Sequence, residues 1–146
     1  MDKAILKEKI LEIALQKLRH IEQLISETRA SNNDTKSSMG DKYETSREML
    51  QQEINRLLSQ RSEIQQQLEN LQKLPITTHS KIAFGSFVET SLGSFYISES
   101  LGKVQLGDIH CIAISISSPL AQNLLGKSQG ELFLIQTKKH HIINIY

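Results

Sequence analysis

Two carboxylates three residues apart are the side chains in this sequence with the clearest potential for chemistry. Asp41 and Glu44 lie where a polar stretch passes into an amphipathic run. On a helix this spacing places both side chains on one face, with their Cβ atoms about 5–6 Å apart. Two such groups can share a divalent cation if water and a partner supply the remaining ligands. They can equally cap a helix N-terminus, where acids complement the macrodipole, and the pattern alone leaves both interpretations open.

The other candidate sites lack an essential part of their motif. Gly126-Lys127-Ser128 resembles the end of a phosphate-binding loop, but Ala121 stands where that motif needs a glycine. His140 and His141 are neighbours whose side chains point to opposite faces of a strand, so they cannot jointly hold one metal. Cys111 lies inside an apolar run, which predicts a buried, inert thiol. We therefore expect no enzyme active site of the chain's own and no resident cofactor.

The elements that must position the two acids are helices with a seven-residue apolar repeat. Residues 1–74 contain one glycine and no proline. A repeat of seven keeps an apolar seam facing a partner helix, as a coiled coil requires. The first seam contains Ala4, Leu11, Ala14, Leu18, Ile21 and Ile25, and the second contains Leu50, Ile54, Leu57, Ile64, Leu68 and Leu71. The polar break between the runs predicts an antiparallel hairpin with its tip near residues 31–45, and pairing with another chain is the alternative.

Residues 75–146 have the composition of a small sheet domain, because they hold six of the seven glycines and both prolines. A short helix is predicted at residues 119–125, with Ser118 as N-cap, Pro119 at its first position and Gly126 at its stop. The nearly continuous apolar run at residues 109–116 predicts a fully buried strand. Strands are predicted in the ranges 82–88, 94–97, 109–116, 132–135 and 142–145. The predicted class is α+β: a long coiled-coil hairpin over residues 1–74, then an antiparallel sheet with one helix over residues 75–146.

Composition limits the classes of function further. The chain has 146 residues, a net charge of +1 and a single cysteine. Binding of duplex nucleic acid through bulk charge needs a marked basic excess, which is absent. A disulfide framework is excluded as well. No segment reaches the roughly 20 apolar residues of a membrane span, and the first residues do not read as a signal peptide, so we expect a cytoplasmic protein without a membrane partner.

The segment from Ile114 to Glu131 resembles the C-terminal signature of the Gre family of bacterial transcription elongation factors. The signature has Ser-Pro-Leu, then Leu-Leu-Gly-Lys, then a glycine and an acid. The positions kept in this sequence are Ser118, Pro119, Leu120, Leu124, Leu125, Gly126, Lys127 and Gly130. Ala121 replaces a glycine and Glu131 an aspartate. The segments at residues 82–86 and 142–145 are also similar to family positions. With the coiled-coil hairpin before them, the resemblance covers essentially the whole chain.

The resemblance implies an FKBP-like C-terminal domain that docks on bacterial RNA polymerase and has no prolyl isomerase activity. The docking residues that it implies are Ser118, Pro119, Leu120, Gly126 and Lys127. It also implies a monomer whose helical arm enters the secondary channel of the polymerase. There the two tip acids would help to hold a Mg²⁺ ion shared with the polymerase active site, which cleaves backtracked RNA.

The resemblance aligns Gly40, Asp41 and Glu44 with the tip motif Gly-Asp-Leu-Ser-Glu-Asn, whereas Lys42 and Tyr43 depart from it. Some family members with altered tips inhibit transcription, so a channel-binding regulator without cleavage activity is one alternative. A self-assembling coiled-coil module unrelated to transcription is another. Four basic residues flank the tip and can contact the 3′ end of the nascent RNA or form a solvated rim: Arg29, Lys36, Lys42 and Arg47.

Overall fold

The computed structural model describes the backbone of residues 1–36 and 42–146 and the side chains of residues 1–32 and 45–146. The helices are α1 (Lys3–Lys36), α2 (Lys42–Gln72) and α3 (Pro119–Leu124). The strands are β1 (Phe87–Thr90), β2 (Gly93–Ser98), β3 (Gly102–Leu106), β4 (Ile109–Ser115), β5 (Leu132–Ile135) and β6 (Lys138–Ile145). Among the described helices, none combines the length and the apolar character needed to cross a membrane.

The chain forms two compact units. The arm unit comprises Ala14–Leu68, and the sheet unit comprises Met1–Ile13 together with Glu69–Tyr146. The base of the helical hairpin therefore belongs to the sheet unit. This division brings the first turns of α1 into one compact body with strands that begin only at Phe87.

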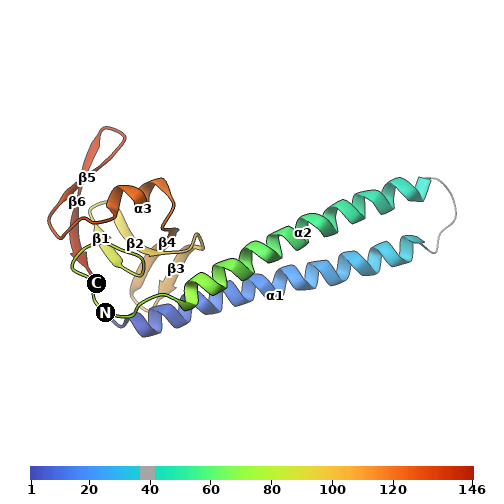
Figure 1. Ribbon diagram of the computed structural model, residues 1–146, viewed down its shortest axis with the longest axis horizontal. Helices are drawn as coiled ribbons and strands as arrows, with labels where there is room; N and C mark the ends of the chain where they lie inside the picture. The colour runs from blue at the N-terminus through green and yellow to red at the C-terminus, as the bar shows by residue number, and fades with distance from the viewer. Residues whose placement is uncertain (37–41) are drawn as a thin grey trace. The chain divides into compact units, whose positions relative to one another are not determined.

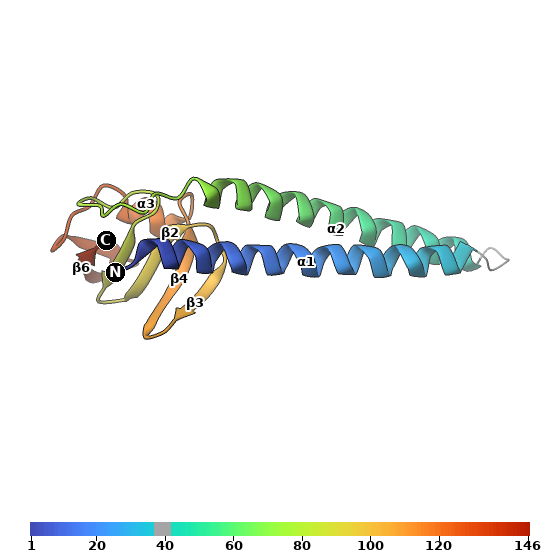
Figure 2. The ribbon, with the colours of Figure 1, turned by 90° about the horizontal axis from the view of Figure 1, so that it is seen from below.

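The arm unit is the predicted antiparallel hairpin, in which α1 and α2 run side by side (Figures 1 and 2). Ile25, Ile54 and Leu57 are buried. These positions belong to the predicted seams, and the half-buried residues along the same stripes continue them: Leu18, Ile21, Leu50, Arg61, Ile64 and Leu68. The repeat of seven residues thus positions the apolar interface, as predicted.

The sheet unit contains one six-stranded sheet with the order β3-β4-β2-β1-β6-β5. Strands β2 and β4 run parallel, with Phe95 opposite Ile112, whereas the other neighbouring strands are antiparallel. The prediction of about five purely antiparallel strands was therefore wrong in this detail. The missed strand is β3, which forms a hairpin with β4 at the sheet edge and returns β4 beside β2 in the same direction.

One face of the sheet packs against α3. The core on this side contains Ile82, Val88, Phe95, Ile97, Ala121, Leu124, Phe133 and Ile142. We call this the α3 face. The burial of these residues follows from the alternation of side chains along each strand.

The opposite face of the sheet, which we call the base face, carries Phe87, Tyr96, Val104, Cys111 and Ala113, all of them buried. The side chains that can cover them in this unit are the buried apolar residues at the hairpin base, Leu6, Ile10, Leu71 and Leu74. The first turns of α1 indeed pass beneath β2 and β4 (Figures 1 and 2). The base of the hairpin thus serves as the second layer over the sheet.

Two sequence-based expectations about burial need correction. Strand β4 is not buried throughout, because only Cys111 and Ala113 are buried in it and Ile112 is 41% exposed. It alternates because α3 leaves this part of its face open. Ala4, expected in the first seam, is exposed, while Leu6 and Ile10 are fully buried. The pattern of burial in the first turns of α1 is therefore set by packing within the sheet unit, not by the seam of the arm.

The hairpin base is also held by polar contacts within the sheet unit. Lys3 Nζ donates to the carbonyl oxygens of Thr77 (2.6 Å) and Tyr146 (3.2 Å). Lys7 Nζ donates to the carbonyl of Gln72 (2.8 Å), the last residue of α2, and to that of Leu74 (2.9 Å), two residues after the helix. A cation is favourable there because the last carbonyls of a helix lack partners and carry the negative end of its dipole.

Candidate functional site

The side chains of the two tip acids lie outside the described residues. Asp41 lies outside the described residues, and for Glu44 only the backbone, within α2, is described. The same holds for the side chains of Lys36 and Lys42, whose backbones lie in α1 and α2. Their assignment as metal and RNA ligands stays a prediction. Among the described side chains, no group of three or more His, Cys, Asp or Glu residues could hold a metal ion.

The described residues nearest to the tip show how the hairpin continues towards it. Arg29 is exposed on α1, whereas Arg47 on α2 is half-buried. Arg47 lies seven residues before Ile54, so it continues the seam, and its Nε is buried with no hydrogen-bond partner among the described residues. Asn32 on α1 is 8% exposed, and its Oδ1 is likewise buried with no partner in the described part of the chain. Of the two described arginines predicted to contact RNA, Arg29 is the one that faces solvent.

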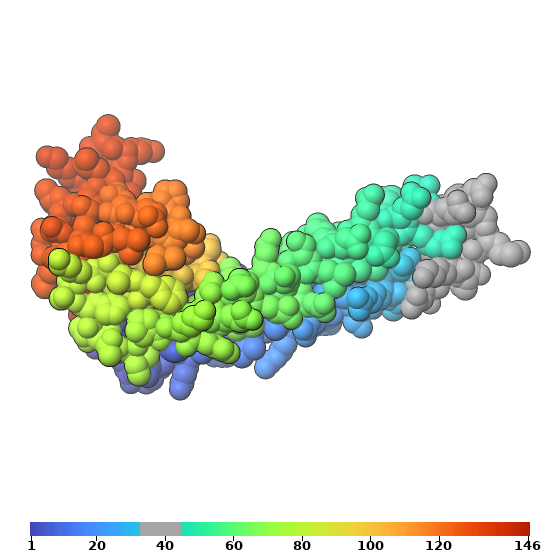
Figure 3. Space-filling view, in the orientation of Figure 1, coloured from blue at the N-terminus to red at the C-terminus, as the bar shows by residue number. Residues whose placement is uncertain are grey.

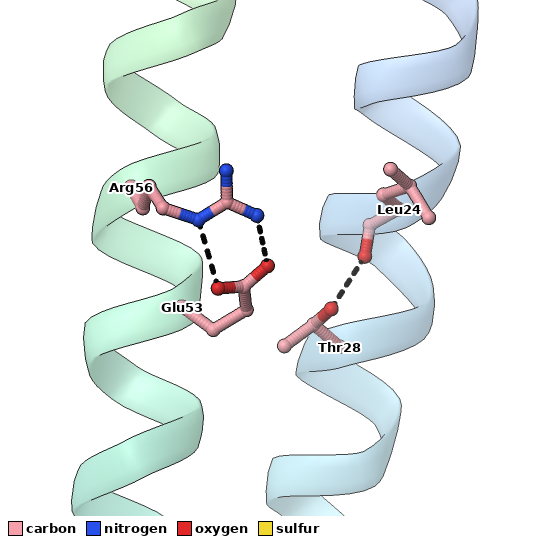
Figure 4. A network of polar contacts seen from close by, with 4 residues as sticks. All are labelled: Leu24, Thr28, Glu53 and Arg56. Carbon is pink, nitrogen blue, oxygen red and sulfur yellow. Dashed lines mark hydrogen bonds and ion pairs between the residues drawn. The ribbon is translucent and has the colours of Figure 1, made fainter.

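Further along the arm, polar contacts are made within each helix. Glu53 accepts two hydrogen bonds from Arg56 three residues later, and Thr28 Oγ1 donates to Leu24 O over 2.7 Å (Figure 4). The hydrogen bonds from Arg56 lower the pKa of Glu53, so this carboxylate is ionised at neutral pH. Such exposed pairs contribute little to stability. They keep the surface of the arm charged and solvated.

The signature segment folds as a short, well-capped helix. The side chain of Ser118 accepts a hydrogen bond from the N–H of Ala121 at 3.2 Å, and Pro119 occupies the start of α3. A serine N-cap satisfies an N–H that would otherwise lack a partner, and proline suits the first helical position. Leu120 packs partly buried against the core of the α3 face. The predicted helix and its cap are confirmed, and Pro119 is exposed.

Gly126 and Lys127 join the end of α3 to the segment before β1. Gly126 has φ +80°, which favours glycine, and its N–H donates to Ile82 O at 2.8 Å. Ile82 N in turn donates to Lys127 O at 2.9 Å. The two segments that resemble the family, around residue 82 and around residue 126, are therefore bonded to each other.

Two polar residues beside the start of α3, Ser117 in the preceding loop and Gln122 within the helix, are not among the sequence-predicted site residues. The hydroxyls of Ser115 and Ser117 lie 2.9 Å apart, and the side-chain amide of Gln122 donates to Ile116 O at 2.7 Å. Ser117 and Gln122 are exposed beside Pro119. The sequence feature that could have identified them is their position next to a capped helix, where a loop can present polar groups to a partner.

The single thiol behaves as expected. Cys111 is 5% exposed, and burial raises its pKa to about 11. A thiol with such a pKa is protonated at neutral pH and is a poor nucleophile. The prediction of a buried, inert cysteine is confirmed.

Comparison of the chain with protein-family models and with curated proteins finds no match. Among solved structures, it is similar to Thermus aquaticus Gfh1, with 22% identity, a TM-score of 0.37 and coverage of 92% of each chain. It is also similar to GreA factor homolog 1 (Gfh1) of Thermus thermophilus, with 20% identity, a TM-score of 0.35 and coverage of 93% of this chain and 94% of that chain. At these values no function or site residue is carried over from either protein.

Proposed function

We propose that this chain is a transcription factor that binds bacterial RNA polymerase, inserts its helical arm into the secondary channel and stimulates cleavage of backtracked RNA. The observation that carries the proposal is the structure of the signature segment. The residues that resemble the Gre family form one bonded assembly, the capped helix α3 with its stop at Gly126 and its link to Ile82. That assembly belongs to the sheet unit, and the same chain also forms a two-helix arm unit, as the resemblance implies.

In the proposed mechanism the arm of this chain positions two carboxylates, and the polymerase provides the active site. The buried apolar residues of the described part of the arm pair its two helices and leave no interior there for a catalytic pocket. Its contribution is to bring Asp41 and Glu44 to the active site of the polymerase. When bound there, Mg²⁺ supplies the activation of water and the stabilisation of the leaving oxygen. The two carboxylates of this chain would orient and retain that ion, and the polymerase would supply the other ligands.

A cleavage assay on arrested elongation complexes tests the proposal. The wild-type chain with Mg²⁺ is expected to shorten the RNA, and the D41N/E44Q variant is expected to lose this effect while still binding polymerase in fluorescence anisotropy. The matched control is E22A/E63A, which removes two exposed carboxylates from the shaft of the arm. Cleavage by D41N/E44Q at the wild-type rate would contradict the role of the tip acids, and a lack of polymerase binding would contradict the whole proposal.

A second function is favoured by the tip sequence itself. Lys42 and Tyr43 replace the Leu and Ser of the family motif. A lysine next to Asp41 adds a positive charge where the proposed site must attract a cation, which favours a regulator that occupies the channel without promoting cleavage. The same assay separates the two functions, because this regulator slows elongation and produces no shortened RNA. The K42L/Y43S variant would then gain cleavage activity.

A further inference from the structure

We propose that the outward face of the β5–β6 hairpin is a docking surface for an amphipathic helix of a partner protein whose apolar stripe is bordered by acidic residues. This inference does not rest on the proposed function. The surface, which we call the hairpin face, lies on the side of the sheet away from α3. It is formed by Leu132, Leu134, Lys139, His141 and Ile143.

Alternation along the two strands separates this face from the core. Phe133 and Ile142 are 2% and 1% exposed and belong to the core of the α3 face. Leu132 and Leu134 lie on either side of Phe133, so they point the other way, and they are 56% and 53% exposed. Ile143 follows Ile142 at a bulge and is 43% exposed. Three large apolar side chains are thus open to solvent on one small hairpin.

The base face over the other strands of the sheet is covered, whereas the hairpin face is not. Over β1, β2 and β4 the base face is buried beneath the hairpin base, where Leu6 and Ile10 are fully buried. Over β5 and β6 the apolar side chains on this side are exposed, and this hairpin projects from the edge of the sheet (Figures 1 and 3). An apolar sheet face is normally packed against a helix, and here the chain leaves that layer unfilled. A helix from another protein is therefore the fitting occupant.

The charges around the hairpin face determine the chemistry of that helix. A groove of about 280 Å³ between α3 and the edge of β5 borders the hairpin face, and it is lined by Asn123, Lys127, Leu132, Phe133, Leu134 and Lys139. Two of these described lining residues are lysines and none is acidic. Lys139 lies directly opposite Leu134 in the hairpin, and His141 lies opposite Leu132. An apolar centre with a basic border is complementary to a leucine-rich stripe flanked by glutamate or aspartate.

The hairpin face is also held rigidly in place, which lowers the entropic cost of binding. The side-chain amide of Asn123 on α3 donates to Leu134 O at 2.6 Å. His141 N donates to Ser91 Oγ at 3.0 Å, and Ser91 N donates to His141 O at 3.1 Å. Strand β5 is therefore bonded to α3, and β6 is bonded to the turn between β1 and β2.

The test is an NMR titration of the full chain with two designed helical peptides. Each has about 18 residues and the same leucine stripe, flanked by glutamates in one peptide and by lysines in the other. The acidic peptide is expected to shift amide signals of residues 123–143 and to bind about 10-fold more tightly than the basic one. The K127E/K139E variant should reverse this preference, and L132S/L134S should weaken binding of the acidic peptide by about 10-fold. L15S/M49S, which removes two exposed apolar residues from the arm, is the control and should bind normally.

Several outcomes would overturn the proposal. These are equal binding of both peptides, shifts confined to other parts of the chain, or no shifts at about 1 mM peptide. Concentration-dependent shifts of the hairpin face without peptide would identify a second copy of the chain as its occupant. Tighter binding to vesicles of phosphatidylcholine with about one third phosphatidylglycerol would identify a lipid surface instead. The leucine variant must retain the wild-type melting temperature, and if it does not, the charge-reversal variant alone decides.

Discussion

Replacing Lys7 by methionine should loosen the base of the hairpin. The side chain of Lys7 donates to the carbonyls of Gln72 and Leu74 at 2.8 and 2.9 Å. Hydrogen bonds from a charged donor contribute about 1.5–3 kcal/mol when shielded, and less where water can replace them. The bond to Gln72 is exposed and the bond to Leu74 is partly buried, so we count mainly the second one. The lost interaction with the α2 terminus adds about 0.5 kcal/mol.

The expected loss in free energy of unfolding for K7M is therefore about 2 kcal/mol, which corresponds to a melting temperature lower by about 4–8 °C. Urea unfolding followed by tyrosine fluorescence measures it, because Tyr96 and Tyr146 lie in the sheet unit. Methionine keeps most of the apolar stem, so the change reports the charge and its hydrogen bonds. The control is K9M at an equally half-buried lysine of the same helix. Equal stability of K7M and K9M would show that the hydrogen bonds of Lys7 to Gln72 and Leu74 do not stabilise the base of the hairpin.

Two further predictions concern the linker and α3. Ser86 Oγ accepts from Ala83 N, so its hydroxyl proton is free to donate to His79 Nδ1 at 2.6 Å, which requires a neutral imidazole. Burial, and secondarily the charge of Lys3, lower the pKa of His79 in the folded protein below its ordinary value of 6.5. Neutral His79 therefore contributes its full stabilisation above pH 6.5. This stabilisation is lost as the pH falls from 6.5 through the lower pKa of the folded state. The free energy of unfolding, measured between about pH 7 and 5, should fall in the wild type and fall less in H79N. The same dependence of this free energy on pH in both proteins would contradict the prediction. Removal of the N-cap in S118A should cost about 1 kcal/mol and speed amide exchange in α3, and unchanged exchange would show that the cap is dispensable.

The features that could be predicted from the sequence are those specified by local patterns. The repeat of seven residues identifies Leu57 and Ile54 as seam positions because a helix places such residues on one stripe regardless of the rest of the chain. Helix α3 was predictable because Ser118, Pro119 and Gly126 each act within one turn of it. These short-range rules predict both the arm and the capped helix of the candidate docking segment.

The features that escaped prediction depend on distant partners. Strand β3 carries few apolar residues, and its place at the sheet edge is set by its pairing with β4, for example Val104 opposite Cys111. The parallel pairing of β2 with β4 follows from that placement and from no local signal. In the sequence Lys3 and Lys7 are indistinguishable from the other exposed charges of an amphipathic helix. In the structure they donate to the carbonyls of Gln72, Leu74, Thr77 and Tyr146. Long-range contacts of this kind leave no periodic trace in the sequence.

The shared use of the hairpin base couples the folding of the two halves of the chain. Phe87, Tyr96 and Val104 are buried on the base face, which α3 does not cover because it packs on the opposite side. The buried apolar residues that can cover them lie in residues 1–13 and 69–74 of the same unit. We therefore expect pairing of the two ends of the hairpin to assist formation of the sheet unit, since it brings together the segments that carry Leu6 and Leu71. The same coupling means that a polar substitution at Leu6, far from α3 in sequence, would destabilise the unit that presents the candidate docking residues.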